Sequence, residues 1–530
     1  MEAREAAMPG TRPGAAARER RHRGRKHDVF SGVSMAVATV VLLFVGSAIV
    51  AIVAGGIAHF GEAVTSAEVL FSLRMSVVTS SISTVLCLVL AGLLLAGLAL
   101  FLFRFFSDGG HWASSPFNRH LYNSAGQLIS GTLLDRDGEV LSAVDQSGSR
   151  TYPDGETRRK SILHVVGDPY GSIGTGALTA FADRLTGFDL LNGAFGAQRG
   201  NQVYLTIDAD LNETAYRALN GRKGTVAVYN YQTGEILCLV SSPSFDPRNI
   251  PSGLETDPSY DGVYLNRFLS STFPPGSIFK TVTLAAALEE LPDLEERTWV
   301  CEGSAQIGDG TVTCTAAHGE QDIREALANS CNVVFGQLAV ELGGSTLERY
   351  AGKAGLTSRY SVNGIPTAAG SFSLTGISDN DLAWAGVGQY HDAVNPCSML
   401  VYMGAIANGG RAAVPCLLLQ VDTPGLPDLP QFTRRTGRLI ARDTAETLAD
   451  MMAYNVTAAY GTSRFPNMDL CAKSGTAEVG GGQAPHAWFT GFLRDEDHPY
   501  AFLVLVENGG SGSSAAGDVA SRVLNALVSP

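Results

Sequence analysis

Residues 273–288 read Phe-Pro-Pro-Gly-Ser-Ile-Phe-Lys-Thr-Val-Thr-Leu-Ala-Ala-Ala-Leu. Pro-Pro-Gly does not fit a helix interior, whereas the residues that follow are apolar or small, so a buried helix is predicted to begin at or near Ser277. Ser277 and Lys280 are three residues apart, a spacing that places both side chains on one helix face. The segment therefore predicts a hydroxyl and an amine held side by side.

Such a pair is suited to nucleophilic catalysis. A serine hydroxyl is a weak nucleophile until a neighbouring base removes its proton. Lysine acts as that base when burial and a nearby cation lower its pKa, and the start of a helix offers N–H groups to developing negative charge. A Ser-x-x-Lys tetrapeptide alone is also typical of a capping serine followed by a surface lysine.

Two further segments favour the catalytic interpretation. Ser330-Cys331-Asn332 follows downstream, and Lys473-Ser474-Gly475-Thr476 lies on a predicted strand. Ser-x-x-Lys, Ser-Asp-Asn and Lys-Thr-Gly in this order are the signature of penicillin-binding proteins and class A β-lactamases. The differences, a Cys in the second motif and a Ser in the third, are conservative at the reacting atoms.

On these motifs the chain resembles a class B penicillin-binding protein, a membrane-anchored D,D-transpeptidase of peptidoglycan synthesis. The resemblance runs from about Asn118 to the C-terminus and is closest to the subtype called penicillin-binding protein A. Beyond the three motifs it rests on four segments, namely Gly131–Leu141, Val226–Pro247, His486–Phe492 and Val506–Gly510.

The resemblance implies a role for each motif residue. Ser277 would be the acylated nucleophile and Lys280 its general base. Ser330 would relay a proton to the departing D-alanine amine, Asn332 would hold the backbone of the stem peptide, and Lys473 would add positive potential near Ser330.

The third motif would bind the substrate. Thr476 would hydrogen-bond the substrate carboxylate, its N–H and that of Ser277 would form the oxyanion hole, and Ser474 and Gly475 would line the site. The resemblance implies no cofactor and no metal.

The pattern of the chain predicts an α/β domain. Strands are predicted near 225–229, 236–240, 470–477, 487–492 and 500–506, with helices at 209–219 and 515–527 and a mostly helical middle at 280–407. Strands from both ends of a domain favour one sheet covered by helices. The pattern thus predicts an antiparallel sheet with helices on both faces, and the resemblance implies that this is the five-stranded sheet of a serine β-lactamase/transpeptidase-like fold.

Two apolar runs precede this domain, at about Val33–Ala58 and Val77–Phe103, and neither contains Asp, Glu, Lys or Arg. Each exceeds the roughly 18–20 residues that cross a bilayer. We expect a basic cytoplasmic arm at 1–29, a membrane anchor with two apolar helices at 30–106, a small β-rich pedestal at 107–200 and the transpeptidase domain at 201–530.

The charges leave the membrane topology open. Residues 1–27 carry eight Lys or Arg against three Glu, a net charge of +5 within a total of −13, and such an arm tends to remain cytoplasmic. Two crossings would then return the catalytic domain to the cytoplasm. If the domain works at the extracytoplasmic face of the bacterial plasma membrane, one run does not span or the arm is translocated.

The eight cysteines are scattered without a C-x-x-C pair, so their spacing does not indicate a zinc, haem or thioredoxin-like site. Cys301 and Cys314 flank the Gly-rich stretch 303–313, which is a candidate hairpin. The pair is either a disulfide or two free thiols.

The function predicted from these features is crosslinking of D-Ala-D-Ala stem peptides through a serine acyl-enzyme that β-lactams inhibit. Alternatives are a β-lactam receptor, a non-catalytic scaffold and a serine β-lactamase. No segment between the anchor and Gly200 is large enough for a glycosyltransferase domain, so glycan polymerisation would come from another protein. The resemblance implies a polytopic glycan polymerase as that partner, and membrane lipid is expected to contact the anchor. The acidic body is a poor surface for nucleic acid.

Overall fold

The computed structural model describes residues 29–57, 60–113, 124, 131–186, 188–189, 193–194, 200–422 and 432–529. The chain divides into two compact units, Met1–Phe103 and Arg104–Pro530. The predicted basic arm lies outside the described residues, apart from Val29 at its end.

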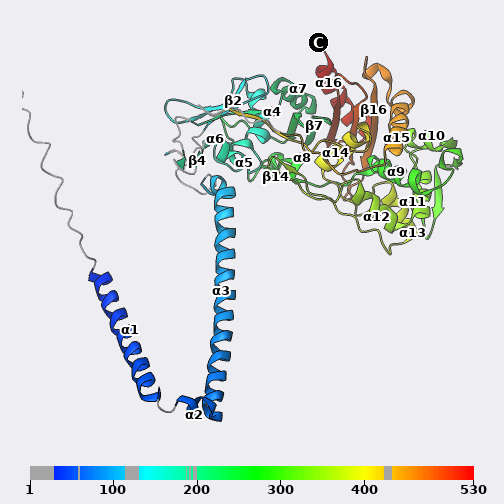
Figure 1. The fold of residues 1–530 in the computed structure, drawn as a ribbon. Helices are drawn as coiled ribbons and strands as arrows, with labels where there is room; N and C mark the ends of the chain where they lie inside the picture. Colours follow the sequence, from blue (N-terminus) through cyan, green and yellow to red (C-terminus); the bar gives the residue numbers. More distant parts are fainter. Residues whose placement is uncertain are drawn as a thin grey trace, which may run out of the picture. The chain divides into compact units, whose positions relative to one another are not determined.

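The described residues of the first unit are mostly helical, with α1 at Val29–Gly56, α2 at Phe60–Thr65 and the larger part of α3, which begins at Ala67 and ends in the second unit at Ala113 (Figure 1). Two stretches are long and apolar enough to cross a membrane by length and composition, Ser34–Gly56 and Ala67–Gly109. The described residues of both predicted apolar runs are therefore helical. The second helix is longer than its run because polar residues at both ends continue it.

Short strands form the pedestal. β1 (Thr132–Leu134) and β2 (Val140–Val144) are antiparallel, with Leu133 opposite Ser142, and β3 (Arg150–Thr151) pairs with β2. β6 (Gln202–Leu205) and β15 (Leu418–Asp422) complete the sheet in the order β15-β6-β1-β2-β3. β4 (Phe188–Asp189) and β5 (Gly193–Ala194) form a separate pair. The sheet thus combines the predicted hairpin with strands from far along the sequence.

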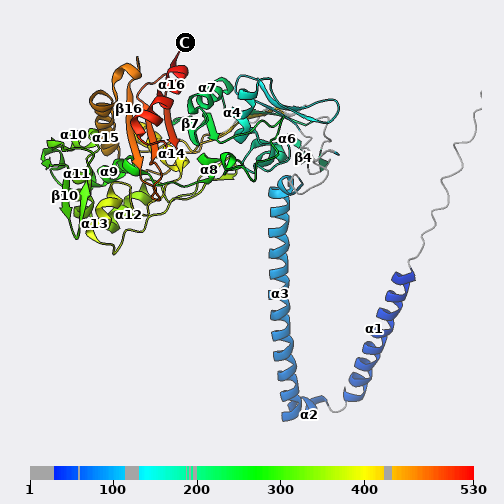
Figure 2. The ribbon, with the colours of Figure 1, turned by 180° about the vertical axis from the view of Figure 1, so that it is seen from behind.

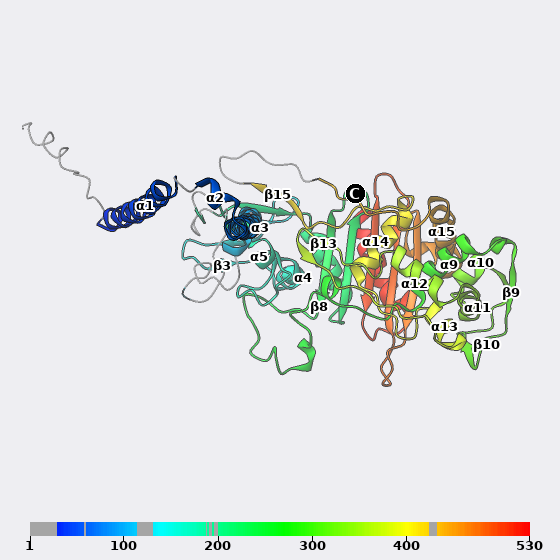
Figure 3. The same cartoon turned by 60° about the horizontal axis from the view of Figure 1, so that its bottom comes forward.

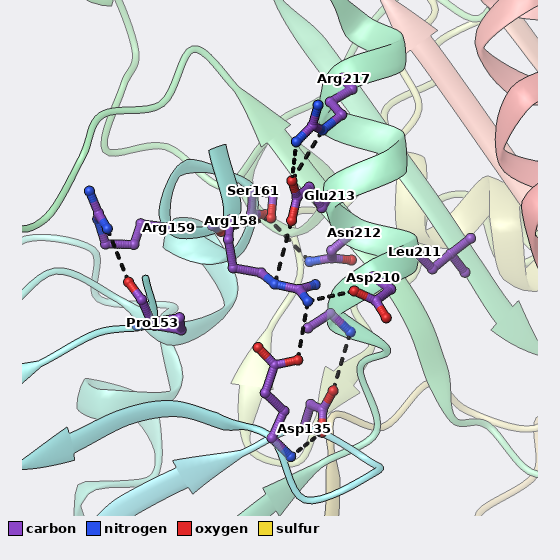
Figure 4. A network of polar contacts seen from close by, with 12 residues as sticks. Asp135, Pro153, Arg158, Arg159, Ser161, Asp210, Leu211, Asn212, Glu213 and Arg217 are labelled. Carbon is purple, nitrogen blue, oxygen red and sulfur yellow. Dashed lines mark hydrogen bonds and ion pairs between the residues drawn. The ribbon is translucent and has the colours of Figure 1, made fainter. Parts of the chain in front are cut away.

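Three helices lie in the sequence between β3 and β6 of this sheet, namely α4 (Glu156–Val166), α5 (Ala177–Ala180) and α6 (Ala182–Thr186). In Figure 4, Arg158 of α4 faces carboxylates from two other segments. Its Nη2 lies 3.1 Å from Glu139 Oε2 and 2.5 Å from Asp210 Oδ1, and its Nε lies 3.5 Å from Glu213 Oε2. One guanidinium therefore joins the β1–β2 turn to α7 (Ala209–Leu219), the first helix after the pedestal strands.

A five-stranded antiparallel sheet forms the centre of the second unit. Its order is β16-β17-β18-β7-β8, and the strands span Leu470–Ala477, His486–Leu493, Tyr500–Val506, Gly224–Asn230 and Ile236–Ser242. All four neighbouring pairs are antiparallel. The predicted sheet is confirmed. Each strand either matches its predicted range or extends one or two residues beyond it.

Alternate residues of each strand enter two different cores. In β18, Phe502 and Val504 pack into a core with α7 and α16 (Gly517–Val528), whereas Leu503 and Leu505 pack into the core that holds α9 (Lys280–Glu290) and α14 (Pro396–Ala407). Figure 2 shows α16 in red across the strands, and Figure 3 shows α14 in yellow across the sheet. Both faces are therefore covered by helices, as predicted.

The segment between β8 and β15 carries seven of the α-helices that the structure describes in the second unit. They are α8 (Arg267–Ser270), α9 (Lys280–Glu290), α10 (Ile323–Ala328), α11 (Asn332–Leu342), α12 (Gly344–Lys353), α13 (Asp379–Gly386) and α14, and α15 (Arg442–Asn455) follows β15. Short strand pairs interrupt them: β9 (Thr298–Cys301) with β12 (Gly319–Asp322), β10 (Ser304–Ile307) with β11 (Gly310–Thr313), and β13 (Ser361–Val362) with β14 (Ile365–Pro366). The 303–313 stretch is thus the hairpin that its glycines suggested.

Candidate active site

The first motif lies at the start of α9. Residues Gly276–Ile278 form a short 3-10 turn, η5, and the α-helix continues from Lys280, so Ser277 lies one turn ahead of the helix proper. Lys280 is fully buried, and its Nζ lies 3.1 Å from Ser277 Oγ. The predicted pairing of hydroxyl and amine on one face is confirmed.

Gly276 allows this turn to approach the sheet closely. Its φ is +55°, and a Cβ at this position would lie 2.6 Å from the carbonyl oxygen of Thr476 on β16. The Gly276 N–H donates to Gly388 O at 2.8 Å. The backbones of the first and third motifs are therefore in direct contact, which places Ser277 and Thr476 at the same cleft.

The second motif lies between α10 and α11. Ser330 has φ +53°, a left-handed conformation that is uncommon outside glycine and often found at functional sites. Lys280 Nζ donates to Ser330 O at 2.5 Å and to Asn332 Oδ1 at 2.7 Å. The strained turn thus directs both a carbonyl and an amide oxygen at the buried amine.

The third motif completes the cluster from β16, which is an edge strand of the central sheet. Lys473 is fully buried, and its Nζ donates to Ser330 Oγ at 3.0 Å and to Ser474 O at 3.0 Å. Lys280 Nζ also lies 3.2 Å from Ser330 Oγ. The Ser330 hydroxyl therefore lies between the two lysine side chains.

Burial governs the charge of both lysines. It lowers the pKa of Lys280 from 10.5 to about 7. Burial, reinforced by the charge of Lys280, also lowers the pKa of Lys473 well below its usual value. Two ammonium groups in one low-dielectric cluster destabilise each other, so a neutral Lys280 is accessible near neutral pH.

Two residues that contact the third motif were not predicted from the sequence. Tyr460 accepts a hydrogen bond from the Ser474 N–H at 2.8 Å and donates its own hydroxyl hydrogen to Ser474 Oγ at 3.1 Å. Gln389 Nε2 donates to Thr476 O at 3.2 Å. Neither residue belongs to a recognisable motif, because each reaches β16 only through the tertiary fold.

A second cluster adjoins the active site. Cys301, Cys314, His318 and Cys331 each bring a potential metal-ligating atom to within 4.8 Å of the others. All eight cysteines of the chain are free, so Cys301 and Cys314 are thiols rather than a disulfide. The cysteine spacing did not indicate this cluster, because its members come from separate segments instead of one C-x-x-C turn.

The cluster is linked to the second motif through the start of α11. Cys314 Sγ accepts the N–H groups of Asn332 at 3.1 Å and Val333 at 3.4 Å, and it lies 3.7 Å from Cys331 Sγ. The contact with Cys331 and these N–H groups lower the pKa of the Cys314 thiol. A sulfur atom therefore caps the helix that begins with Asn332.

The fold and the cleft define a class of protein, the serine acyl-transferring enzymes of the β-lactamase/transpeptidase fold. Residues 224–529 match the family of penicillin-binding protein transpeptidase domains, which covers more than half of the chain. The chain belongs to this family of peptidoglycan D,D-transpeptidases, as its motifs indicated.

Named relatives agree with this assignment. The chain is 30% identical over 356 residues to the peptidoglycan D,D-transpeptidase PbpA of Mycolicibacterium smegmatis, covering 60% of this chain and 70% of the relative. It is 31% identical over 353 residues to PbpA of Mycobacterium tuberculosis, with the same coverages. The predicted resemblance to the penicillin-binding protein A subtype is therefore confirmed, because both of these relatives are named PbpA.

Solved structures share the fold. The D,D-transpeptidase domain of a peptidoglycan glycosyltransferase from Eggerthella lenta superposes with a TM-score of 0.64 at 28% identity, covering 75% of this chain and 98% of that structure. Penicillin-binding protein A from M. tuberculosis, as its penicillin G acyl-enzyme complex, gives a TM-score of 0.65 at 25% identity, covering 76% of this chain and 100% of that structure.

Proposed function

We propose that this chain crosslinks peptidoglycan stem peptides ending in D-Ala-D-Ala through an acyl-enzyme on Ser277, and that β-lactams acylate the same hydroxyl. One observation carries the assignment of roles: Lys280 Nζ lies 3.1 Å from Ser277 Oγ while Lys473 Nζ lies 3.0 Å from Ser330 Oγ. The penicillin G acyl-enzyme of the M. tuberculosis relative supports the same chemistry.

Lys280 acts as the base in its neutral form. A neutral amine has two hydrogens and one lone pair, and the short contacts to Ser330 O (2.5 Å) and Asn332 Oδ1 (2.7 Å) take both hydrogens. The lone pair is then available to the Ser277 hydroxyl. Lys280 removes that proton as Oγ attacks the carbonyl carbon of the penultimate D-alanine.

Ser330 returns a proton to the leaving amine. Its hydroxyl contacts both lysine nitrogens, so it passes a proton from the amine that received one to the nitrogen of the departing D-alanine. The C–N bond breaks and the C–O bond of the acyl-enzyme remains. An amine of a second stem peptide then attacks the ester, and Ser277 recovers its proton by the reverse route.

The third motif binds the substrate. The N–H groups of Ser277 and Thr476 hold the oxyanion, and each such donor is typically worth about 10²–10³ in rate. Thr476 Oγ1 and Lys473 bind the terminal carboxylate, whose negative charge favours the protonated form of Lys473, with Ser474 and Gly475 beside it. Because β16 is an edge strand, an extended stem peptide adds to it by main-chain hydrogen bonds.

The N-terminal helices anchor the enzyme in the bacterial plasma membrane, with the catalytic unit at the extracytoplasmic face. Their apolar side chains are exposed in the described structure, which supports contact with lipid and with a polytopic glycan polymerase. The basic arm favours the cytoplasm, so we propose an odd number of crossings. Reporter fusions after Gly61 and after Asp108 test this, since a cytoplasmic signal after Asp108 would contradict it.

Transfer to an amine acceptor tests the proposed activity. The detergent-purified chain is given a D-Ala-D-Ala depsipeptide and a D-amino acid acceptor, and the aminolysis product is measured against hydrolysis. We expect transfer that Ser277→Ala abolishes and that Ser259→Ala, a change in the exposed 3-10 turn Pro258–Tyr260, leaves unaltered. Rapid catalytic hydrolysis of penicillin would instead indicate a β-lactamase, and an absence of any acyl-enzyme would indicate a scaffold.

A further inference from the structure

The cluster of Cys301, Cys314, His318 and Cys331 is assembled from four places in the fold. Cys301 ends β9, Cys314 follows β11, His318 precedes β12, and Cys331 lies between α10 and α11. The register of the β9–β12 pair sets Gly319 opposite Cys301, which brings the neighbouring His318 to the same end. Separate elements therefore deliver four potential ligands to one point.

The geometry of the cluster suits a tetrahedral ion. A Zn–S bond of about 2.3 Å places two tetrahedral sulfur ligands roughly 3.8 Å apart. Cys314 Sγ and Cys331 Sγ are separated by 3.7 Å, and all four ligand atoms lie within 4.8 Å of one another. A small contraction around an ion is sufficient to close the set.

The surroundings of the cluster point to a ligand as well. His318 Nδ1 is buried and has no hydrogen-bond partner among the described residues, a costly state for a ring nitrogen. Cys301 and Cys331 are buried, whereas Cys314 and His318 are half-buried. The N–H groups of Asn332 and Val333 aimed at Cys314 Sγ are the donors that stabilise a metal-bound thiolate.

We propose that Cys301, Cys314, His318 and Cys331 bind one Zn²⁺ ion, which holds the second catalytic motif in place. Three cysteines and one histidine in a closed tetrahedral set are a structural zinc site. Thiolates with an imidazole favour Zn²⁺ over the oxygen-seeking Mg²⁺ and Ca²⁺.

The position of Cys331 gives the ion its effect on catalysis, a consequence that rests on the proposed function. Cys331 stands between Ser330 and Asn332, and Cys314 caps the helix that starts at Asn332. An ion bound to both cysteines would fix the left-handed turn at Ser330. It would also keep the Cys314–Cys331 pair from oxidising to a disulfide, which would remove two ligands.

Metal analysis of the full chain tests the site independently of activity. The chain is purified in detergent without a metal-affinity tag, and its metal is quantified by plasma mass spectrometry. We expect one zinc per chain, lost by more than tenfold in Cys301→Ser and His318→Ala and unchanged in the matched control Cys416→Ser. The replacement His318→Cys should retain zinc, because four cysteines also form a zinc site.

Cobalt substitution reports the coordination directly. Co²⁺ in the wild-type chain should give thiolate charge-transfer bands and the intense visible bands of a tetrahedral site, with a changed spectrum in His318→Cys. Zinc removal should slow acylation by fluorescent penicillin at least severalfold, and added Zn²⁺ should restore it. A metal-free chain with a Cys314–Cys331 disulfide, or zinc content indifferent to Cys301→Ser and His318→Ala, would overturn the proposal.

Discussion

Among single residues, Lys280 and Lys473 carry the proposed chemistry because they share one buried environment. Both amines are fully buried and both contact the Ser330 hydroxyl. The Ser277–Lys280 pair was predictable because helical spacing is a local property. The contact between Lys473 and Ser330 rested on resemblance to a family, since 143 residues separate them and no local pattern encodes their approach.

The pKa of Lys280 predicts how acylation depends on pH. Because the base must be neutral and burial lowers its pKa to about 7, the acylation rate should rise with pH through a midpoint near 7 and then level off. Stopped-flow acylation by penicillin between pH 5.5 and 9 measures this. A flat profile, or a midpoint near the 10.5 of an ordinary lysine, would contradict the assignment of the base.

The same shift predicts the direction of a stability change. The unfolded chain protonates Lys280 up to about pH 10.5, whereas the folded chain releases that proton near pH 7. The unfolded state therefore binds more protons across this window, so this group makes the free energy of unfolding rise with pH from about 7 to 10.5.

Tyr460 should prove to be a positioning residue for the third motif. Tyr460→Phe leaves the Ser474 N–H without its partner, and an unsatisfied buried donor costs about 1–3 kcal/mol. We expect a lower melting temperature and slower acylation, with Ser277 still the labelled residue. Tyr170→Phe, at an exposed tyrosine of the second unit, is the control and should change neither property. If Tyr460→Phe and Tyr170→Phe show the same melting temperature and the same acylation rate, Tyr460 does not position the third motif.

At the scale of elements, the contact between η5 and β16 shapes the cleft. The alternation of apolar residues predicted the five strands well, because both faces of the sheet are buried. Helix α4 was missed, since its first turns carry Arg158, Arg159 and Lys160 and show no clear apolar stripe. The Cys/His cluster was missed because its ligands converge only in three dimensions.

Gly276→Ala should test the close approach of the two elements. The new Cβ would lie 2.6 Å from Thr476 O in a left-handed conformation, so both strain and steric overlap oppose it. Gly138→Ala, at φ +89° with nothing within 4 Å, is matched for strain alone, which costs about 1–2 kcal/mol. Gly276→Ala should lower the melting temperature further and abolish acylation. If both changes lower the melting temperature equally, the close contact between the backbones of η5 and β16 is not needed for stability.

At the scale of the whole molecule, the pedestal and the sheet domain are joined by shared structure. β6 and β15 belong to the pedestal sheet while their neighbours in sequence belong to the catalytic domain. The ion pairs of Arg158 with Glu139 and Asp210 also link the pedestal to α7. Such pairing of distant segments could not be predicted from the sequence, because strands of four or five residues carry little periodicity.

Arg158→Ala should weaken that link. It leaves the carboxylates of Glu139, Asp210 and Glu213 close together without their common cation. We expect a loss of about 1 kcal/mol, because the side chain of Asp210 is largely exposed (86%) and that of Glu139 is partly exposed (43%). Arg217→Ala removes only an exposed i,i+4 partner of Glu213 and should change stability by about 0.5 kcal/mol or less. Thermal unfolding in low and high salt measures the stability of the two variants. If both variants lose the same free energy of unfolding, the ion pairs of Arg158 do not stabilise the connection between the pedestal and α7.

Three distant motifs meet in one cleft, and we propose that Ser277 is acylated there. Peptide mass spectrometry after incubation with penicillin locates the adduct most directly. The account predicts one penicilloyl group per chain, on Ser277, absent from Ser277→Ala and formed far more slowly in Lys280→Ala and Lys473→Ala. An adduct on another residue, or undiminished labelling of Ser277 without either lysine, would contradict it.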